Sequence, residues 1–145
     1  MNRYLLDLNT LLALLDPQHI HHDAAHHWVE TTPSLRFLTC PLVQNGVIRV
    51  ASQKAYPNSL GNAAVVHAIL STFCADPRHE FCPDDISLLA PAHLANPAQL
   101  TPSRVTDLYL LALAKHHGAS LATFDRRIPA AAIPNGDAHL NIIEA

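Results

Sequence analysis

Short and long apolar segments alternate along the chain, with polar residues and prolines between them. The short segments have the length of buried strands and lie at residues 4–6, 36–39, 80–82, 121–123 and 140–143. The longer segments predict helices at residues 8–15, 41–52, 63–74 and 101–117, with a further helix around Trp28 and Val29. Short strands that alternate with helices predict an α/β fold with a parallel sheet.

Several boundaries carry their own signals. Pro41 suits the first turn of a helix, and Gly118 is a typical C-terminal stop for the helix before it. Residues 63–74 are apolar on all sides, which predicts a packed helix. Residues 83–102 contain four prolines and should form irregular or short helical pieces over the surface.

Three aspartates stand where chemistry is expected. Asp7 and Asp125 each follow an expected strand directly, and functional residues of parallel α/β sheets gather outside the carboxyl ends of the strands. Taken singly, each is also explained as a helix cap or a turn residue. Asp107 lies in the second turn of an expected buried helix, where a carboxylate is costly unless it is paired or binds a metal. Arg104 is the nearby cationic partner, at i−3.

Convergence of these acids would call for a cation, because three carboxylates at one sheet edge repel one another. Hard oxygen ligands without cysteine suit magnesium or manganese. Such a site lowers the pKa of a bound water and stabilises the charge that develops on a phosphate oxygen.

Composition narrows the class of protein. The 145 residues suit a single domain, residues 1–145, and a chain with 49% hydrophobic and 14% charged residues is expected to fold. Proteins that bind nucleic acid by phosphate neutralisation alone tend to be strongly basic, whereas the net charge here is −3. Affinity for a nucleic acid would therefore need a local patch, a metal or a basic partner, and the candidate phosphate contacts are Arg49, Arg104, Arg126 and Arg127.

Three cysteines without a C-x-x-C pair indicate a reduced, cytosolic chain with neither a disulfide framework nor a cysteine-built zinc site. Asp7 comes too early for a signal-peptide core, and no apolar run approaches transmembrane length. We therefore expect a cytoplasmic protein without a membrane contact.

A histidine cluster at residues 19–27 suggests zinc, because His22 and His26 would share one face of a helix. The competing explanation is a solvated loop and helix start, with Trp28 turned to the core. Without cysteines or a fixed supporting partner, the solvated explanation is favoured.

Segments around all three acids resemble the PIN-domain family. Residues 4–9, Tyr-Leu-Leu-Asp-Leu-Asn, are similar to its first motif. Residues 106–114 and 118–126 are similar to its C-terminal acidic motifs in order and spacing, and residues 40–46 with Arg49 are similar to a sub-group of VapC toxins. The resemblance covers nearly the whole chain and implies a central parallel sheet flanked by helices.

The same resemblance implies a magnesium-dependent endoribonuclease, the toxin of a type II toxin–antitoxin system. Such toxins are usually dimeric and are held inactive by a VapB antitoxin. Carried over residue by residue, Asp7, Asp107 and Asp125 would be the catalytic and metal-site acids. The supporting polar groups near them would be Asn9, Thr106 and Thr123.

One position departs from the family pattern. Many PIN domains carry a glutamate in the helix after the second strand, whereas this chain has Gln44-Asn45-Gly46. Gln44 or Asn45 would supply a neutral oxygen to a metal or its water, but neither acts as a general base. We therefore expect one metal with a water-mediated amide contact.

Two alternatives remain open at this point. The missing glutamate would suit a PIN-like module that has lost catalysis and works by binding antitoxin or RNA. Residues 7–10 also loosely resemble the nucleophile motif of haloacid-dehalogenase phosphatases. That family expects a second aspartate where Asn9 stands and a late acid pair where Asp125 precedes Arg126, so the fit is poor.

Overall fold

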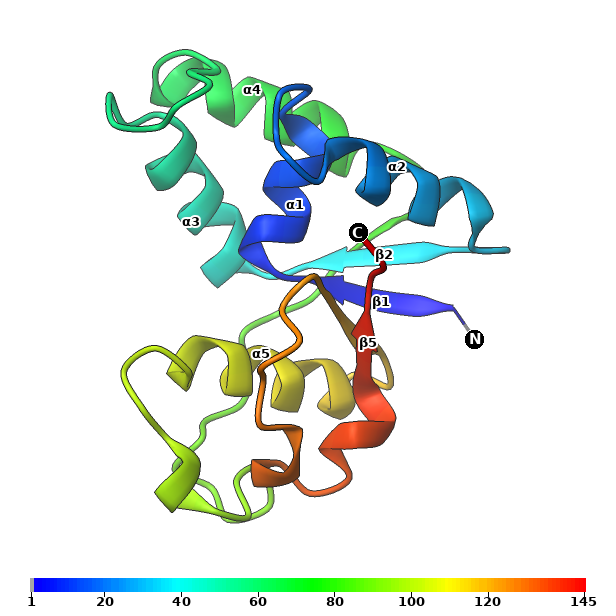
Figure 1. Cartoon of the computed structure of the whole chain (residues 1–145), viewed down its shortest axis with the longest axis vertical. Coiled ribbons are helices and arrows are strands. Elements are labelled where there is room, and N and C mark those ends of the chain that lie inside the picture. The colour runs from blue at the N-terminus through cyan, green and yellow to red at the C-terminus, as the bar shows by residue number, and fades with distance from the viewer. Residues whose placement is uncertain (1) are drawn as a thin grey trace.

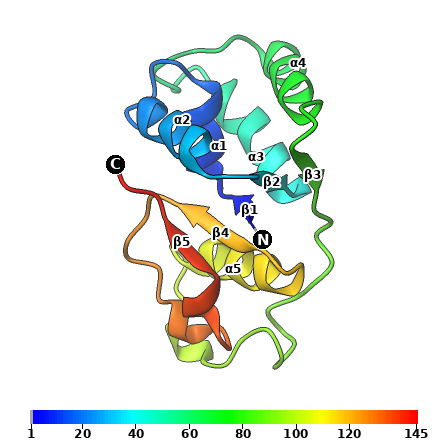
Figure 2. The ribbon, with the colours of Figure 1, turned by 90° about the vertical axis from the view of Figure 1, so that its right-hand side faces the viewer.

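Five parallel strands form one sheet in the order β3-β2-β1-β4-β5 (Figures 1 and 2). The computed structural model describes residues 2–145. The strands are β1 Arg3–Leu6, β2 Arg36–Thr39, β3 His79–Phe81, β4 Ser120–Thr123 and β5 Leu140–Ile142. The helices are α1 Leu8–Leu15, α2 His22–Thr31, α3 Pro41–Ala51, α4 Ala63–Cys74 and α5 Val105–His116.

The sheet is covered on both faces. Helices α1 to α4 lie on one face and α5 on the other (Figures 1 and 2). Leu5 at the centre pairs with Leu38 on one side and Leu121 on the other, and all three are fully buried. Apolar strands of this kind are typical of parallel sheets enclosed by helices. The expected three-layer α/β/α architecture is therefore confirmed.

Two expectations about helices are wrong. Helix α4 has the expected bounds, but only Val66 and Leu70 of it are buried, and Val65 is 44% exposed. It packs mainly on α3, so an apolar surface remains in solvent. Helix α5 begins at Val105, because the Thr101 carbonyl accepts both the Arg104 and Val105 amides in a tight turn. Asp107 consequently lies in the first turn of α5.

There are two smaller differences from the expected elements. Strand β3 begins at His79, one residue earlier than expected, and the histidine-rich stretch is partly helical. Helix α2 starts within that stretch at His22. Gly118 has φ +67°, as a residue that ends a helix in the left-handed region requires. Within residues 2–145, no helix combines the length and apolar character needed to cross a membrane.

The loop between α3 and α4 is fixed to the end of α1 by one carboxylate. Asp16 is buried and accepts hydrogen bonds from Tyr56 Oη at 2.5 Å, Asn58 Nδ2 at 2.9 Å and Gln18 N at 2.9 Å. Burial raises the pKa of Asp16, but the bonds from Tyr56, Asn58 and Gln18 outweigh it and leave the pKa below 3.8.

We predict that Asp16→Asn lowers the free energy of unfolding by about 1–3 kcal/mol at neutral pH, because an amide N–H group replaces one of the two acceptor oxygens and at least one donor loses its partner. Since the folded pKa is lowered, the contribution of the carboxylate is present above pH 3.8 and is lost as the pH falls through the folded pKa. Urea titrations from pH 7 to pH 3 check this. A constant difference between wild type and variant over that range would contradict it.

Candidate active site

Asp7 ends β1 and begins α1. Its Oδ1 accepts the Thr10 amide at 2.9 Å, so the ordinary role of a helix cap applies to it. The residue is only 8% exposed. Burial raises the pKa of Asp7, hydrogen bonds from Thr123 and Thr10 partly offset the rise, and the charge of Asp107 adds to it. Asp7 is therefore both a cap and a buried carboxyl group close to another acid.

Asp125 lies in the turn after β4. Its backbone amide donates to Thr123 Oγ1 at 3.1 Å, and its Oδ1 accepts the Arg127 amide at 2.8 Å, as in an Asx turn. Its Oδ2 accepts Arg104 Nη1 at 2.7 Å. Burial raises the pKa of Asp125, but the hydrogen bonds from Arg104 and Arg127 outweigh it, so the pKa lies below its ordinary value.

Arg104 joins the second and third acids. The same Nη1 that contacts Asp125 lies 3.1 Å from Asp107 Oδ2, and the side chain of Arg104 is largely buried. Burial nevertheless raises the pKa of Asp107 more than Arg104 lowers it. Arg104, expected from the sequence as a phosphate contact, has its guanidinium paired with two carboxylates in this arrangement.

Two cavities open beside the acids. One of about 320 Å³ is lined by Asp7, Asp107, Asn9, Thr106, Gly46 and Arg49, among others. A second of about 560 Å³ is lined by Asp125, Arg126, Arg127, Asn9, His21 and Phe124, among others. Asn9 lines both, so the cavities adjoin at this residue. The structure thus places the expected supporting residues Asn9 and Thr106 next to the acids.

The three aspartates line adjoining cavities, but their carboxylate oxygens are not close enough together to form a compact metal-binding group. Among residues 2–145, the trio of His, Cys, Asp or Glu side chains whose ligand atoms all lie within 4.8 Å of one another is Asp85, His116 and His117. The oxygens of Asp7, Asp107 and Asp125 therefore do not all lie within this distance of one another. Arg104 occupies the space between two of them.

Gln44 and Asn45 do not face the acids, which corrects their expected amide role. Gln44 Nε2 donates to Thr39 Oγ1 at 2.9 Å. Gln44 and Asn45 line a separate cavity of about 230 Å³ between α3 and α4. The face of α3 toward the acids carries Leu42, Gly46 and Arg49, spaced by four and three residues. Gly46 is thus the position of this segment from which a longer side chain would reach the acids.

Sequence reasoning also left several contacts unidentified. The His21 and Phe124 rings stack with centroids 4.4 Å apart in the wall of the larger cavity. His22 Nδ1 and His26 Nε2 lie 2.7 and 3.0 Å from the carbonyl oxygens of Ala13 and Leu14. These two imidazoles therefore hydrogen-bond to backbone carbonyls at the end of α1. This differs from both explanations considered for the sequence, a solvated loop and a zinc site.

One further carboxylate caps a helix from a distance. Asp84 accepts the Leu42 amide at 2.8 Å in the first turn of α3 and the Tyr109 hydroxyl at 2.7 Å. It therefore ties α3 on one face of the sheet to α5 on the other. Since Cys40, the cap residue of α3, makes no side-chain cap bond, this contact replaces a local one. No local spacing in the sequence signals it.

Comparison with known proteins agrees with this architecture. The pattern that describes the PIN domain matches residues 4–134. The chain belongs to the PIN-domain family. Ribonuclease VapC44 of Mycobacterium tuberculosis is 39% identical over 91% of this chain and 92% of its own length. Ribonuclease VapC39 of the same organism is 36% identical over 83% of this chain and 87% of its own length.

Solved structures share the PIN fold at lower identity. Mycobacterium tuberculosis VapC20, described as a sarcin–ricin loop cleaving toxin, superposes with a TM-score of 0.62 at 14% identity and covers 90% of this chain and 96% of its own. The structure of FitAB bound to an IR36 DNA fragment superposes with a TM-score of 0.61 at 18% sequence identity. The match covers 96% of this chain and 94% of the FitAB chain. These likenesses show the fold. Family membership excludes the haloacid-dehalogenase alternative.

The shared ion pair yields a direct prediction for this PIN domain. In metal-free protein, Arg104→Gln should raise the pKa of Asp125, because the neutral amide no longer favours the carboxylate. Carboxyl carbon NMR during a pH titration measures this. Arg36→Gln, which removes a cation paired instead with Glu80, is the control and should leave Asp125 unchanged. An unshifted Asp125 in Arg104→Gln would show that the ion pair is not formed in solution.

Proposed function

We propose that the chain is a divalent-metal-dependent endoribonuclease and the toxin of a type II toxin–antitoxin pair. The observation that carries the proposal is the arrangement of Asp7, Asp107 and Asp125 around two adjoining cavities at the carboxyl ends of β1 and β4. The relatives named ribonuclease over most of the chain support RNA as the substrate.

The donor set fits a hard divalent cation such as magnesium or manganese. Its members are carboxylates, and two of them already hold a cationic group, the guanidinium of Arg104. Asp7, Asp107 and Asp125 would hold the ion, with Asn9, Thr106 and Thr123 as supporting polar groups. When bound, such an ion supplies a water of lowered pKa and stabilises charge on the phosphate.

The chain's own residues position the acids and offset their charge. The Thr123 hydroxyl lowers the pKa of Asp7 and accepts the Asp125 amide, so one side chain orients two acids. Arg49 lies in the wall of the smaller cavity, and Arg126 and Arg127 in the wall of the larger one. These three cations would receive the phosphates, although the chain as a whole is acidic.

The larger cavity suits an unpaired nucleotide. Its wall offers the stacked His21 and Phe124 rings beside the cations of Arg126 and Arg127. Arg126 pairs with Glu144 at 2.7 Å, but both side chains are exposed, so this pair competes weakly with a phosphate. Sequence-specific RNA recognition usually targets single-stranded loops whose bases stack on such rings. We therefore infer that the substrate is a loop in a structured RNA.

Partner binding would use the opposite side of the sheet from α5. Helix α4 exposes Val65 and encloses, with α3, the cavity that contains Ile48 and Leu70. This surface is a suitable contact for a second copy of the chain in a homodimer or for a VapB-like antitoxin. Size-exclusion chromatography with light scattering, with and without the antitoxin, distinguishes the two assemblies.

A second candidate function is a catalytically inactive PIN module that acts by binding. The observation in its favour is Gly46, which leaves the acid cavity without a carboxylate from α3. Purified chain incubated with structured RNA separates the two functions. Metal-dependent cleavage supports the enzyme, and intact RNA with retained antitoxin binding supports the module.

We predict that Asp7→Asn lowers the rate of magnesium-dependent RNA cleavage by about 100-fold or more, because it removes a charged ligand. Asparagine is as good a helix cap as aspartate, so α1 should remain intact. The readout is the single-turnover rate on a structured RNA. The matched control is Asp137→Asn, an exposed aspartate in the short helix Gly136–His139 that lines neither acid cavity. Cleavage at the wild-type rate in Asp7→Asn would refute the assignment of the site.

We also predict that Gly46→Glu tightens manganese binding by roughly tenfold, because added carboxylate charge strengthens such sites. A Cβ at Gly46 would lie 3.4 Å from Leu8 Cδ1, an ordinary contact distance, so α3 should accept it. Asn45→Glu is the control, because this neighbour lines the α3–α4 cavity. Calorimetry measures both variants. Equal affinity in the two would mean that Gly46 does not face the metal site.

A further inference from the structure

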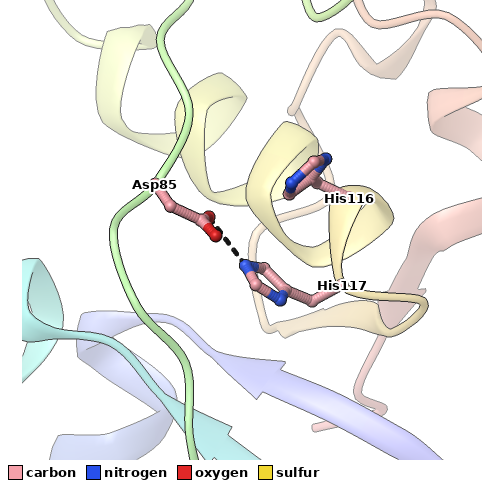
Figure 3. A group of neighbouring side chains, drawn as sticks. All are labelled: Asp85, His116 and His117. Atoms are coloured by element: carbon pink, nitrogen blue, oxygen red, sulfur yellow. Dashed lines mark hydrogen bonds and ion pairs between the residues drawn. The ribbon is translucent and has the colours of Figure 1, made fainter.

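A second group of metal-binding side chains lies at the other end of α5. Asp85, from the loop after β3, meets His116 and His117 at the end of the helix (Figure 3). One possible ligand atom from each of the three lies within 4.8 Å of the other two. Asp107 is in the first turn of the twelve-residue helix and His116 is its last residue, so about 14 Å of helix separates this group from the acids.

Local structure holds these side chains in place. Asp85 Oδ1 lies 2.8 Å from His117 Nε2, as the dashed line in Figure 3 shows. The His117 carbonyl accepts Arg3 Nη1 from the first strand, which fixes the backbone where the helix ends. The carbonyl end of a helix carries partial negative charge, which favours a cation there.

A third imidazole stands beside the group. The His93 ring, from the same loop as Asp85, is 5.3 Å from the His116 ring between centroids and meets it edge-on. The Asp85–His117 contact accounts for two of these residues, and edge-to-face packing brings the His116 and His93 rings together beside them. Imidazole nitrogens with one carboxylate oxygen are a common ligand set for zinc, and magnesium prefers oxygen ligands alone.

We propose that Asp85, His116 and His117 bind zinc or a chemically similar divalent transition metal, which leaves one position of a four-coordinate site open. The ion ties residues 83–104 to the end of α5. Within that loop the structure describes one short helix, Pro97–Gln99, and most of its backbone hydrogen bonds are local turns. Ala95 and Asn96 connect it to the rest of the chain by donating to the Ala132 carbonyl. Because the loop leads directly to Arg104, the ion also steadies the approach to the acids.

The test uses the full chain without an affinity tag, stripped of metal by a chelator and then titrated with zinc in a calorimeter. Excess magnesium is present to occupy the acid site. We expect one zinc ion per chain, with affinity at least about tenfold weaker in Asp85→Asn and in His117→Gln. His67→Gln, on exposed α4, and Asp7→Asn, in the acid site, are controls that should leave the affinity unchanged.

Two further readouts separate binding here from binding elsewhere. Zinc at about 100 times its Kd should raise the Tm of the wild type by roughly 5 °C or more and slow proteolysis within residues 83–104. Both effects should disappear in Asp85→Asn and His117→Gln, whose folding circular dichroism verifies. Zinc affinity and Tm shifts that are the same in these variants as in wild type, or that are lost instead in Asp7→Asn, would overturn the proposal.

Discussion

The guanidinium of Arg104 between Asp107 and Asp125 is the interaction on which the candidate site depends. Arg104 Nη1 donates to the carboxylates of both Asp107 and Asp125, and this holds the start of α5 against the turn after β4. Without a cation there, two half-buried negative charges would face each other in a region of reduced dielectric, and a third lies near them in Asp7. The fold therefore demands positive charge at this point, whether from the protein or from a bound ion.

Helix α5 runs from the three aspartates of the candidate active site to the Asp85, His116 and His117 group. Its middle, from Leu110 to Ala114, is buried against the sheet, so its ends are fixed relative to the strands. The amino end presents Asp107 to the acid site, and the carboxyl end presents His116 and His117 to Asp85. The loop of residues 83–104 touches both ends and contributes Asp84, which caps α3 across the sheet. Changes in this loop would consequently reach the acids through Arg104.

Much of this was available from the sequence. Apolar patterning predicted α1, β2 and α4 with the bounds that the structure has. The helix ends were signalled by Asp16-Pro17 directly after α1 and by Asp76-Pro77 shortly after α4. The order of strands and acids placed Asp7 and Asp125 at one sheet edge, since carboxyl ends of parallel strands lie together. The prediction that α4 is packed on all sides was wrong, because an apolar segment does not reveal whether another element covers it.

The sequence by itself determined the α/β architecture, the family and the choice of Asp7, Asp107 and Asp125 as candidate site residues, because these follow from local periodicity and from motifs of adjacent residues. Only the tertiary structure decided which way each side chain of α3 faces, so that Gly46 rather than Gln44 borders the acid cavity. It also decided that Arg104 binds two acids and that Asp85 meets His117 across 32 residues of chain. Such contacts depend on helix rotation and loop path, which long-range packing sets and local sequence does not.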